Sequence, residues 1–291
     1  MALLPVFEEL YDLGILLGTG ASSSVFSCRE RATGEEYAVK IYDLTRIQGS
    51  SEEVEHCGRI KREIQILLKL DHVGIIQPYK VYSAPGCRLY LVMELCLGGE
   101  LALLLSRFHG RLSEDLTRVI MVQVVSAVGY LHSLGIAHRD LKLENILLLR
   151  PYQDGIDPQI KIVDFGFARY LSSPEPATLA STRPFSLSFL GSLPFAALEI
   201  LAHQHYDCRC DMYSIGVMLY RCLVGSLPSL SNLPFRPEIE PISPIWHVLS
   251  QRAQDLISHL LTVESKRLSA AEFLSHPWCG SDHSQKMPTE Q

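Results

Sequence analysis

The sequence lacks the features that usually mark membrane, secreted and nucleic-acid-binding proteins. No apolar run among its 291 residues approaches the ~18 residues that a transmembrane helix needs. The apolar first seven residues carry no basic segment and are followed at once by Glu8 and Glu9, which is not the pattern of a signal peptide. The formal net charge of −6 gives no reason to expect binding to nucleic acid or to a membrane surface. We therefore expect an intracellular protein, in the cytoplasm, the nucleus or both.

The sequence also lacks paired cysteines of the kind that build disulfide frameworks or zinc sites. Its eight cysteines are scattered, and reduced thiols are expected in a chain of this length without a signal peptide. Cys208 and Cys210 are separated by a single residue, which is too short for a structural zinc pair. The remaining composition, 47% hydrophobic and 20% charged residues, is ordinary for a globular protein, and the length allows one large domain or two lobes.

Apolar patterns divide the chain near residue 100. Before that point the segments with strand-like composition are 13–17, 25–29, 37–41 and 89–93. Ser50 and Glu53 form a capping-box pattern that opens a helix running to about Leu70. Beyond residue 100 the periodicity predicts helices over 113–135, 211–223 and 253–261, with short strands at 146–149 and 160–163. Residues 172–190 are rich in Ser, Thr and Pro and are predicted to form a long loop.

The most informative segment is HRDLKLEN, residues 138–145, which is followed 19 residues after Asn145 by Asp164-Phe165-Gly166. This arrangement supplies a carboxylate that can orient an attacking hydroxyl, a cation for a migrating phosphoryl group and two oxygen ligands for magnesium. Polar groups so dense between two apolar segments would destabilise a core unless they were used. The Asp-Phe-Gly triplet alone means little, but the two motifs in this order and at this distance are specific.

These motifs resemble those of the eukaryotic protein kinases, and the resemblance runs from about Tyr11 to Trp278. Residues 43–57, 98–100 and 270–278 resemble the calcium/calmodulin-dependent kinase group. The resemblance implies an α+β, bilobal fold. A small antiparallel-sheet lobe with one helix is expected at about 11–93, a connection at 94–99, a larger and mainly helical lobe at 100–278, and a polar tail at 279–291.

The resemblance also assigns catalytic roles. It makes Asp140 the catalytic carboxylate and Lys142 the transition-state cation, with Asn145 and Asp164 as Mg²⁺ ligands. Lys142 stands two residues after Asp140, which is the pattern of Ser/Thr kinases rather than tyrosine kinases. Asp211 matches the residue that supports the catalytic loop from below.

The predicted ATP site draws on both lobes. Lys40 would contact the α- and β-phosphates and pair with Glu63, while Glu53 is a rival carboxylate in the first helical turn, where it would serve a cap. Met93 would close the back of the adenine site. The other predicted ATP contacts are the backbone of Glu94 and Cys96, together with Gly18, Gly20, Val25, Ala38 and Glu100.

Three departures from the family pattern stand out. Ser23 takes the place of the third glycine of the phosphate-binding loop, which bears on how tightly that loop closes. Leu198 replaces a proline, although Glu199 and its customary partner Arg267 are both present and are expected to form a buried pair. The stretch 228–244 holds five prolines, too closely spaced for the helix that relatives place there, so we predict that this helix is missing or reduced to a turn.

Arg139 makes this an arginine-type catalytic loop. In kinases of this type a phosphate on the activation loop holds the arginine and orders the segment. Ser188 matches the usual phosphorylation site, with Thr182 and Ser186 as alternatives. An activating kinase or autophosphorylation would supply this phosphate, unless the hydroxyls of the loop are merely solvated.

We therefore predict a Ser/Thr protein kinase that transfers the γ-phosphate of ATP directly to a protein hydroxyl. Phe167 favours serine over threonine in relatives. Glu100 and Glu144 favour a basic residue upstream of the target, but Arg221 stands where relatives often carry a second acid, so a mild basic preference is expected. We expect no calmodulin site in the short polar stretch after Trp278.

Two alternatives remain from the sequence. A kinase-like scaffold that binds nucleotide without useful catalysis is favoured by Ser23, by Leu198 and by the truncated larger lobe. The residues that argue against it are Lys40, Glu63, Asp140, Asn145 and Asp164. Phosphotransfer to a small molecule or a lipid needs a deep acceptor pocket, whereas the family-like segment 191–199 favours a protein acceptor.

Overall fold

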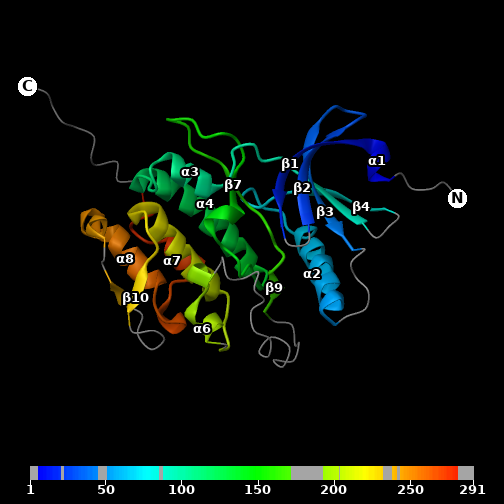
Figure 1. The fold of residues 1–291 in the computed structure, drawn as a ribbon. Coiled ribbons are helices and arrows are strands. Elements are labelled where there is room, and N and C mark those ends of the chain that lie inside the picture. The colour runs from blue at the N-terminus through cyan, green and yellow to red at the C-terminus, as the bar shows by residue number, and fades with distance from the viewer. Residues whose placement is uncertain are drawn as a thin grey trace, which may run out of the picture.

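The protein has two lobes of different architecture (Figure 1). The structure is a computed structural model, and it describes residues 6–20, 23–44, 51–84, 88–171, 193–202, 204–231, 238–240 and 243–280. The smaller lobe is an antiparallel sheet with one long helix beside it, and the larger lobe is mainly helical. The predicted α+β, bilobal fold is therefore confirmed.

The sheet of the smaller lobe has the strand order β1-β2-β3-β5-β4, and every neighbouring pair is antiparallel. Its elements are α1 (Phe7–Leu10), β1 (Tyr11–Thr19), β2 (Ser23–Glu30), β3 (Glu36–Asp43), α2 (Ser51–Leu67), β4 (Pro78–Ala84) and β5 (Arg88–Met93). Side chains alternate along β3, so Ala38 and Tyr42 enter the core cluster that holds the buried residues of α2. Val39 instead packs in a second cluster with Phe7 of α1. The two helices thus cover opposite faces of the sheet.

Helix α4 (Glu114–Ser133) is the central helix of the larger lobe. The Ser113 hydroxyl caps it by accepting a hydrogen bond from the Leu116 N–H at 3.3 Å. By length and composition α4 is apolar enough to cross a membrane, but Val124, Val125 and Leu131 are buried inside the lobe, as in the core helix of a globular protein. The other helical elements of this lobe are α3 (Leu101–Arg107), η3 (Leu193–Phe195), α6 (Leu198–Leu201), α7 (Arg209–Val224), η4 (Pro244–Val248), α8 (Gln251–Leu260), η5 (Glu264–Lys266) and α9 (Ala270–Leu274).

Short strands and a 3₁₀ turn carry the central motifs. They are β6 (Ile136–Ala137), η1 (Leu143–Asn145), β7 (Ile146–Leu148), β8 (Ile160–Ile162) and β9 (Arg169–Tyr170). The β7–β8 and β6–β9 pairs are antiparallel. Strand β8 is also tied to the segment that leads from α2 to β4: the Ile76 N–H donates to the Ile162 carbonyl at 3.0 Å, and the Ile162 N–H donates to the Gly74 carbonyl at 2.8 Å. These two bonds fix the backbone just ahead of Asp164.

The proline-rich stretch contains paired strands. Strands β10 (Ser229–Ser231) and β11 (Glu238–Glu240) are antiparallel, and a 3₁₀ turn begins at Pro244. In the described part of 228–244 there is no α-helix, which confirms the predicted loss for those residues. Residues 232–237 and 241–242 lie outside the described part.

The predicted strands and long helices are confirmed, with ends that move by a few residues. The sequence patterns did not predict the elements α1, α3, α6, α9, β4, β6, β9, β10 and β11. Strand β4 lies at the edge of the sheet, begins with Pro78 and leaves Tyr79 55% exposed, so it lacks the apolar alternation of an inner strand. The Ser50 part of the predicted capping box lies outside the described residues.

Candidate active site

The glycine-rich loop is the turn between β1 and β2. Gly18 is paired with Val25 in the β1–β2 register, and the Gly20 N–H donates to the Ser23 carbonyl at 2.7 Å. A Cβ placed on Gly18 would meet nothing within 4 Å. Packing in the protein therefore does not require glycine at this position, which fits a role in letting a ligand approach the backbone.

Lys40 stands between two carboxylates that come from different lobes. Its Nζ lies 2.6 Å from Glu63 Oε1 and 3.2 Å from Asp164 Oδ1. Burial acts to lower the pKa of Lys40, but Glu63 and Asp164 outweigh it and hold that pKa above its ordinary value. Burial likewise acts to raise the pKa of Asp164, and Lys40 reverses this, so the carboxylate stays ionised. The structure thus pairs Lys40 with Glu63, and the side chain of Glu53 lies outside the described part.

The predicted adenine-binding segment follows β5. Met93 is buried and pairs with Ala38 of β3. The Glu94 N–H donates to the Gln77 carbonyl at 2.9 Å, which leaves the Glu94 carbonyl as its backbone group for a ligand. Among the hydrogen bonds of the described residues, none uses the Cys96 N–H or the Glu94 carbonyl. These two groups therefore match the predicted purine contacts.

Asp140 lies at the centre of the catalytic loop and is buried. Its Oδ2 accepts from Lys142 Nζ at 2.9 Å and from Asn145 Nδ2 at 3.0 Å, and Asn145 Nδ2 also donates to the Asp140 carbonyl at 2.7 Å. The other carboxylate oxygen, Oδ1, is buried and has no hydrogen-bond partner among the described residues. Buried acceptors are seldom left without a donor, so Oδ1 marks the position where a ligand donor would be satisfied.

Asp211 holds the backbone of the catalytic loop from α7. Its Oδ2 accepts from the His138 N–H at 2.9 Å and its Oδ1 from the Arg139 N–H at 2.8 Å, while His132 Nε2 lies 2.9 Å from Oδ2. Arg139 and Asp164 both adopt positive φ, 66° and 62°. Such backbone strain in non-glycine residues persists only where the surroundings enforce it, and the Asp211 bonds supply that constraint at Arg139.

His138 joins the two motifs. Its Nε2 lies 3.2 Å from the Val163 carbonyl, which can only accept, so Nε2 carries the proton. Its Nδ1 then accepts from the Asp140 N–H at 3.3 Å. The ring also packs edge-on against Phe165, with the centroids 4.8 Å apart. The segment before Asp164 is thereby fixed against the catalytic loop.

The Arg139 side chain has two hydrogen-bond partners in the described residues. Its Nε donates to the Phe167 carbonyl at 2.8 Å, and its Nη1 donates to the Tyr206 hydroxyl at 2.5 Å. The predicted phosphorylation sites Ser188, Thr182 and Ser186 lie outside the described part of the chain. Their relation to Arg139 therefore stays a prediction.

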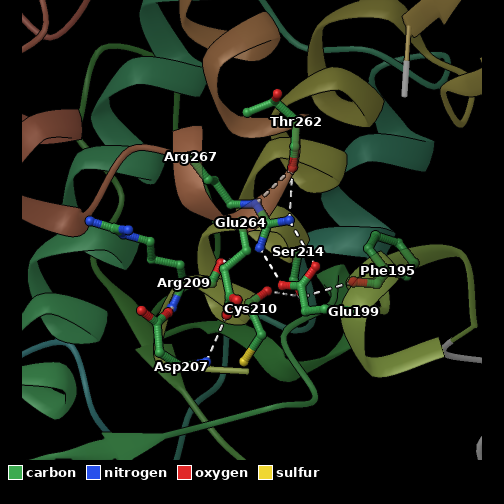
Figure 2. Close-up of polar contacts among 9 residues, drawn as sticks. All are labelled: Phe195, Glu199, Asp207, Arg209, Cys210, Ser214, Thr262, Glu264 and Arg267. Atoms are coloured by element: carbon green, nitrogen blue, oxygen red, sulfur yellow. Dashed lines mark hydrogen bonds and ion pairs between the residues drawn. The ribbon is translucent and has the colours of Figure 1, made fainter. Parts of the chain in front are cut away.

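The Glu199–Arg267 pair is buried in the larger lobe (Figure 2). The guanidinium meets the carboxylate through two bonds, Nη1 to Oε1 at 2.5 Å and Nη2 to Oε2 at 3.0 Å. It also donates to the carbonyls of Thr262 and Arg209, and it lies over the Tyr213 ring. The predicted buried pair is confirmed. Leu198 opens α6 and is buried, so the segment around Glu199 is held without the proline of the family pattern.

The pairing of Lys161 with Glu94 and that of Arg139 with Tyr206 were among the polar contacts that were not predicted. Lys161 Nζ lies 2.7 Å from Glu94 Oε1, and Lys161 is only 8% exposed. A lysine between Ile160 and Ile162 in a predicted buried strand is a signal that could have pointed to such a pair. The Arg139–Tyr206 contact had no comparable signal, because the two residues lie far apart in the sequence.

The comparisons agree with this geometry. The sequence model of the family described as protein kinase domain matches residues 11–279. Serine/threonine-protein kinase D2 of Rattus norvegicus is 35% identical over 272 residues, which cover 90% of this chain and 29% of that protein. Calcium/calmodulin-dependent protein kinase type 1 of Caenorhabditis elegans is 36% identical over 280 residues, covering 93% of this chain and 74% of that protein. Mouse serine/threonine-protein kinase 33 is 32% identical over 294 residues, covering 97% of this chain and 57% of that protein. The chain therefore spans less than a third of kinase D2, and by its family match and its site it belongs to the protein kinase family.

Proposed function

We propose that this chain is a Ser/Thr protein kinase that transfers the γ-phosphoryl group of ATP to a protein hydroxyl. The observation that carries the proposal is the state of Asp140. Lys142 and Asn145 hold one of its carboxylate oxygens, whereas Oδ1 is buried and receives no hydrogen bond from the described part of the chain. A serine or threonine hydroxyl is a donor of the right kind, and hydrogen bonding to Oδ1 would orient its oxygen for attack.

The residues present fit a magnesium nucleotide. Asn145 uses its Nδ2 for both bonds to Asp140, so its amide oxygen remains as an acceptor, and Asp164 supplies an ionised carboxylate. Magnesium prefers such oxygen ligands, and when bound it would neutralise charge on the phosphates. Lys40, held by Glu63, would meet the phosphates from the other lobe.

The chain's own groups suit direct transfer. Asp140 would accept the hydrogen bond and then the proton of the attacking hydroxyl, while Lys142 beside it would offset negative charge on the moving group. The proposal includes no phosphorylated enzyme intermediate, because the carboxylate that faces the acceptor is already positioned to serve as a base. We assign serine or threonine as the acceptor because Lys142, two residues after Asp140, resembles the pattern of Ser/Thr kinases.

A serine target with a mild basic preference fits the charges near the catalytic loop. Burial and the neighbouring Glu144 raise the pKa of Glu100, with Lys142 acting in the opposite direction. A substrate cation would relieve this pairing of like charges. Arg221 donates to the carbonyls of Gly110 and Gly225 and thus adds a fixed positive charge to this lobe. A peptide array with a strong acidic preference would contradict this substrate proposal.

Phosphorylation at Ser188, by another kinase or by the chain itself, would add to contacts that Arg139 already makes. The bonds to the Phe167 carbonyl and the Tyr206 hydroxyl orient the guanidinium in the described structure. We therefore expect phosphorylation to raise activity rather than to create it. Loss of all transfer in a Ser188→Ala variant that still folds would contradict this.

The deciding test is transfer of ³³P from ATP, with magnesium, to a serine peptide library. We expect transfer by the wild type and a loss of about 10²–10⁴-fold in Asp140→Asn. ATP binding, followed as the ligand-induced rise in unfolding temperature, is expected to survive in that variant. A wild type that binds ATP but transfers no phosphate, also after phosphorylation of the activation loop, would instead indicate a nucleotide-binding scaffold.

A further inference from the structure

Among the described residues, the buried Tyr42 hydroxyl forms no hydrogen bond of ordinary geometry. Tyr42 is only 1% exposed, and Glu63 lies close enough to affect the pKa of its hydroxyl. A phenylalanine would fill the same space without burying an unsatisfied polar group. The hydroxyl therefore needs an explanation beyond packing.

The location of Tyr42 supplies one. Because side chains alternate along a strand, Lys40 and Tyr42 project from the same face of β3. Lys40 Nζ lies 5.3 Å from the centre of the Tyr42 ring. On the facing helix, Tyr42 shares a buried cluster with Ile60 and Ile64, and the buried Glu63 lies on the same side of that helix.

The Glu63 carboxylate can accept a further hydrogen bond, because its neighbours offset its charge only in part. Burial raises the pKa of Glu63 and Asp164 adds to the rise, whereas Lys40 and the nearby Tyr42 hydroxyl only partly offset it. Burial also raises the pKa of Tyr42, Lys40 opposes the rise, and the nearby Glu63 carboxylate adds to it, so the phenol keeps its proton. The Tyr42 hydroxyl keeps its proton beside a carboxylate whose negative charge is only partly offset, so it can donate a hydrogen bond to that carboxylate.

We propose that Tyr42 is a positioning residue of the ATP site, whose buried hydroxyl donates to the Glu63 carboxylate and keeps Glu63 in place to hold Lys40. In the described structure Lys40 is shared between Glu63 and Asp164. Binding of a magnesium nucleotide gives Lys40 and Asp164 other partners, and the Tyr42 hydroxyl then becomes the second donor that Glu63 needs. The inference rests on the proposed nucleotide site, but it does not require that phosphate is transferred.

The test compares two buried tyrosines of the same lobe. Tyr82 is also buried, and its hydroxyl forms no hydrogen bond of ordinary geometry with the described residues, but it packs with Phe7 and Tyr11 in the cluster on the other face of the sheet. Both Tyr42→Phe and Tyr82→Phe thus remove a buried hydroxyl from the sheet. Only Tyr42→Phe removes it from the face of the sheet that packs against Glu63. ATP affinity, measured by titration calorimetry with magnesium, kcat/KM for ATP and the unfolding midpoint are determined for both variants.

We expect Tyr42→Phe to weaken ATP binding and to lower kcat/KM for ATP about tenfold, equivalent to about 1.4 kcal/mol. Its unfolding midpoint should equal or exceed that of the wild type, because an unsatisfied group has been removed. Tyr82→Phe should leave ATP affinity unchanged. In a Glu63→Gln background, Tyr42→Phe should alter ATP affinity less than twofold, since the acceptor has already been weakened.

The proposal is overturned if Tyr42→Phe binds ATP within twofold of the wild type, as Tyr82→Phe does. It is equally overturned if Tyr42→Phe has its full effect in the Glu63→Gln background. If the wild type transfers no phosphate but Tyr42→Phe still weakens ATP binding, the proposed kinase activity fails and the role of Tyr42 stands.

Discussion

Removing Arg267 should destabilise the larger lobe more than most single substitutions. Its guanidinium is buried and makes two bonds to Glu199 and three to the carbonyls of Thr262 and Arg209. In Arg267→Met the Glu199 carboxylate stays buried without its cation, and both carbonyls lose a donor. Breaking a buried pair in this way costs about 3–5 kcal/mol. We expect the free energy of unfolding to fall by that amount.

The two tryptophans of the chain make this loss measurable in one lobe. Trp246 and Trp278 both belong to the larger lobe and are buried, so their fluorescence during urea denaturation follows that lobe. Glu199→Gln and the double variant with Arg267→Met complete a thermodynamic cycle. We expect the double variant to lose less than the sum of the two single losses, because each single change already removes the shared interaction.

A matched carboxylate on the surface provides the control. Asp115 pairs with Arg118 in the same lobe, but its side chain is 90% exposed. Asp115→Asn should not shift the urea midpoint measurably, since water screens such pairs. If Arg267→Met costs less than about 1 kcal/mol with Glu199 intact, or if Glu199→Gln behaves like Asp115→Asn, the buried pair does not hold this lobe together as argued.

Two further predictions concern the backbone and the acid side of the stability profile. A Cβ on Gly98 would lie 2.2 Å from the Arg150 carbonyl oxygen and 2.4 Å from Leu148 Cβ, so Gly98→Ala should lower the free energy of unfolding by about 1–3 kcal/mol. Gly58→Ala, in α2 with nothing within 4 Å, should raise it by about 0.5–1 kcal/mol, and equal effects in urea denaturation would refute the steric argument. Burial acts to raise the pKa of Asp211, but the hydrogen bonds from His132 and from the Arg139 N–H outweigh it and hold that pKa below its ordinary value. The stability that Asp211 contributes is present above the pKa of this carboxyl in the unfolded chain, and it is lost as the pH falls through its pKa in the folded protein. Between pH 6 and about pH 2, the unfolding midpoint of Asp211→Asn should therefore fall less steeply than that of the wild type.

The parts of the site that the sequence predicted are those encoded over short distances. Asp140, Lys142 and Asn145 lie within one loop, and their spacing alone places three polar groups together. The Lys40–Asp164 contact spans 124 residues, and no periodic pattern specifies it. The family resemblance assigned both residues to the ATP site, Lys40 to the phosphates and Asp164 to magnesium, but the contact between them was not predicted. Neither a periodic pattern nor the resemblance indicated the Arg139–Tyr206 contact, so it became visible only in the structure.

The Lys161–Glu94 pair shows why buried charges are hard to place from a sequence. Glu94 directly follows β5 and Lys161 is the middle residue of β8, and charged residues at either kind of position are more often exposed than buried. What decides their burial is the packing of the 94–99 connection against β7, where the Gly98 N–H donates to the Leu148 carbonyl at 3.0 Å. That packing depends on Gly98 itself, whose close approach to β7 no side chain would allow.

Tyr42 marks the limit of pattern-based prediction within a single strand. The predicted strand ended at Ile41, whereas β3 continues to Asp43, and the period of two that places Lys40 toward α2 places Tyr42 there as well. Had the predicted strand been extended by one residue, the alternation would have placed the Tyr42 side chain on the same face as Lys40, next to the Lys40–Glu63 pair. Its burial still could not have been foreseen, because a tyrosine at a strand end can face either water or a core. The packing of α2 decides between the two, through Ile60 and Ile64, and those same helical turns carry Glu63. The helix that buries the hydroxyl is thus also the one that supplies its acceptor, which is why we treat the orphaned atom as part of the site rather than as a packing defect.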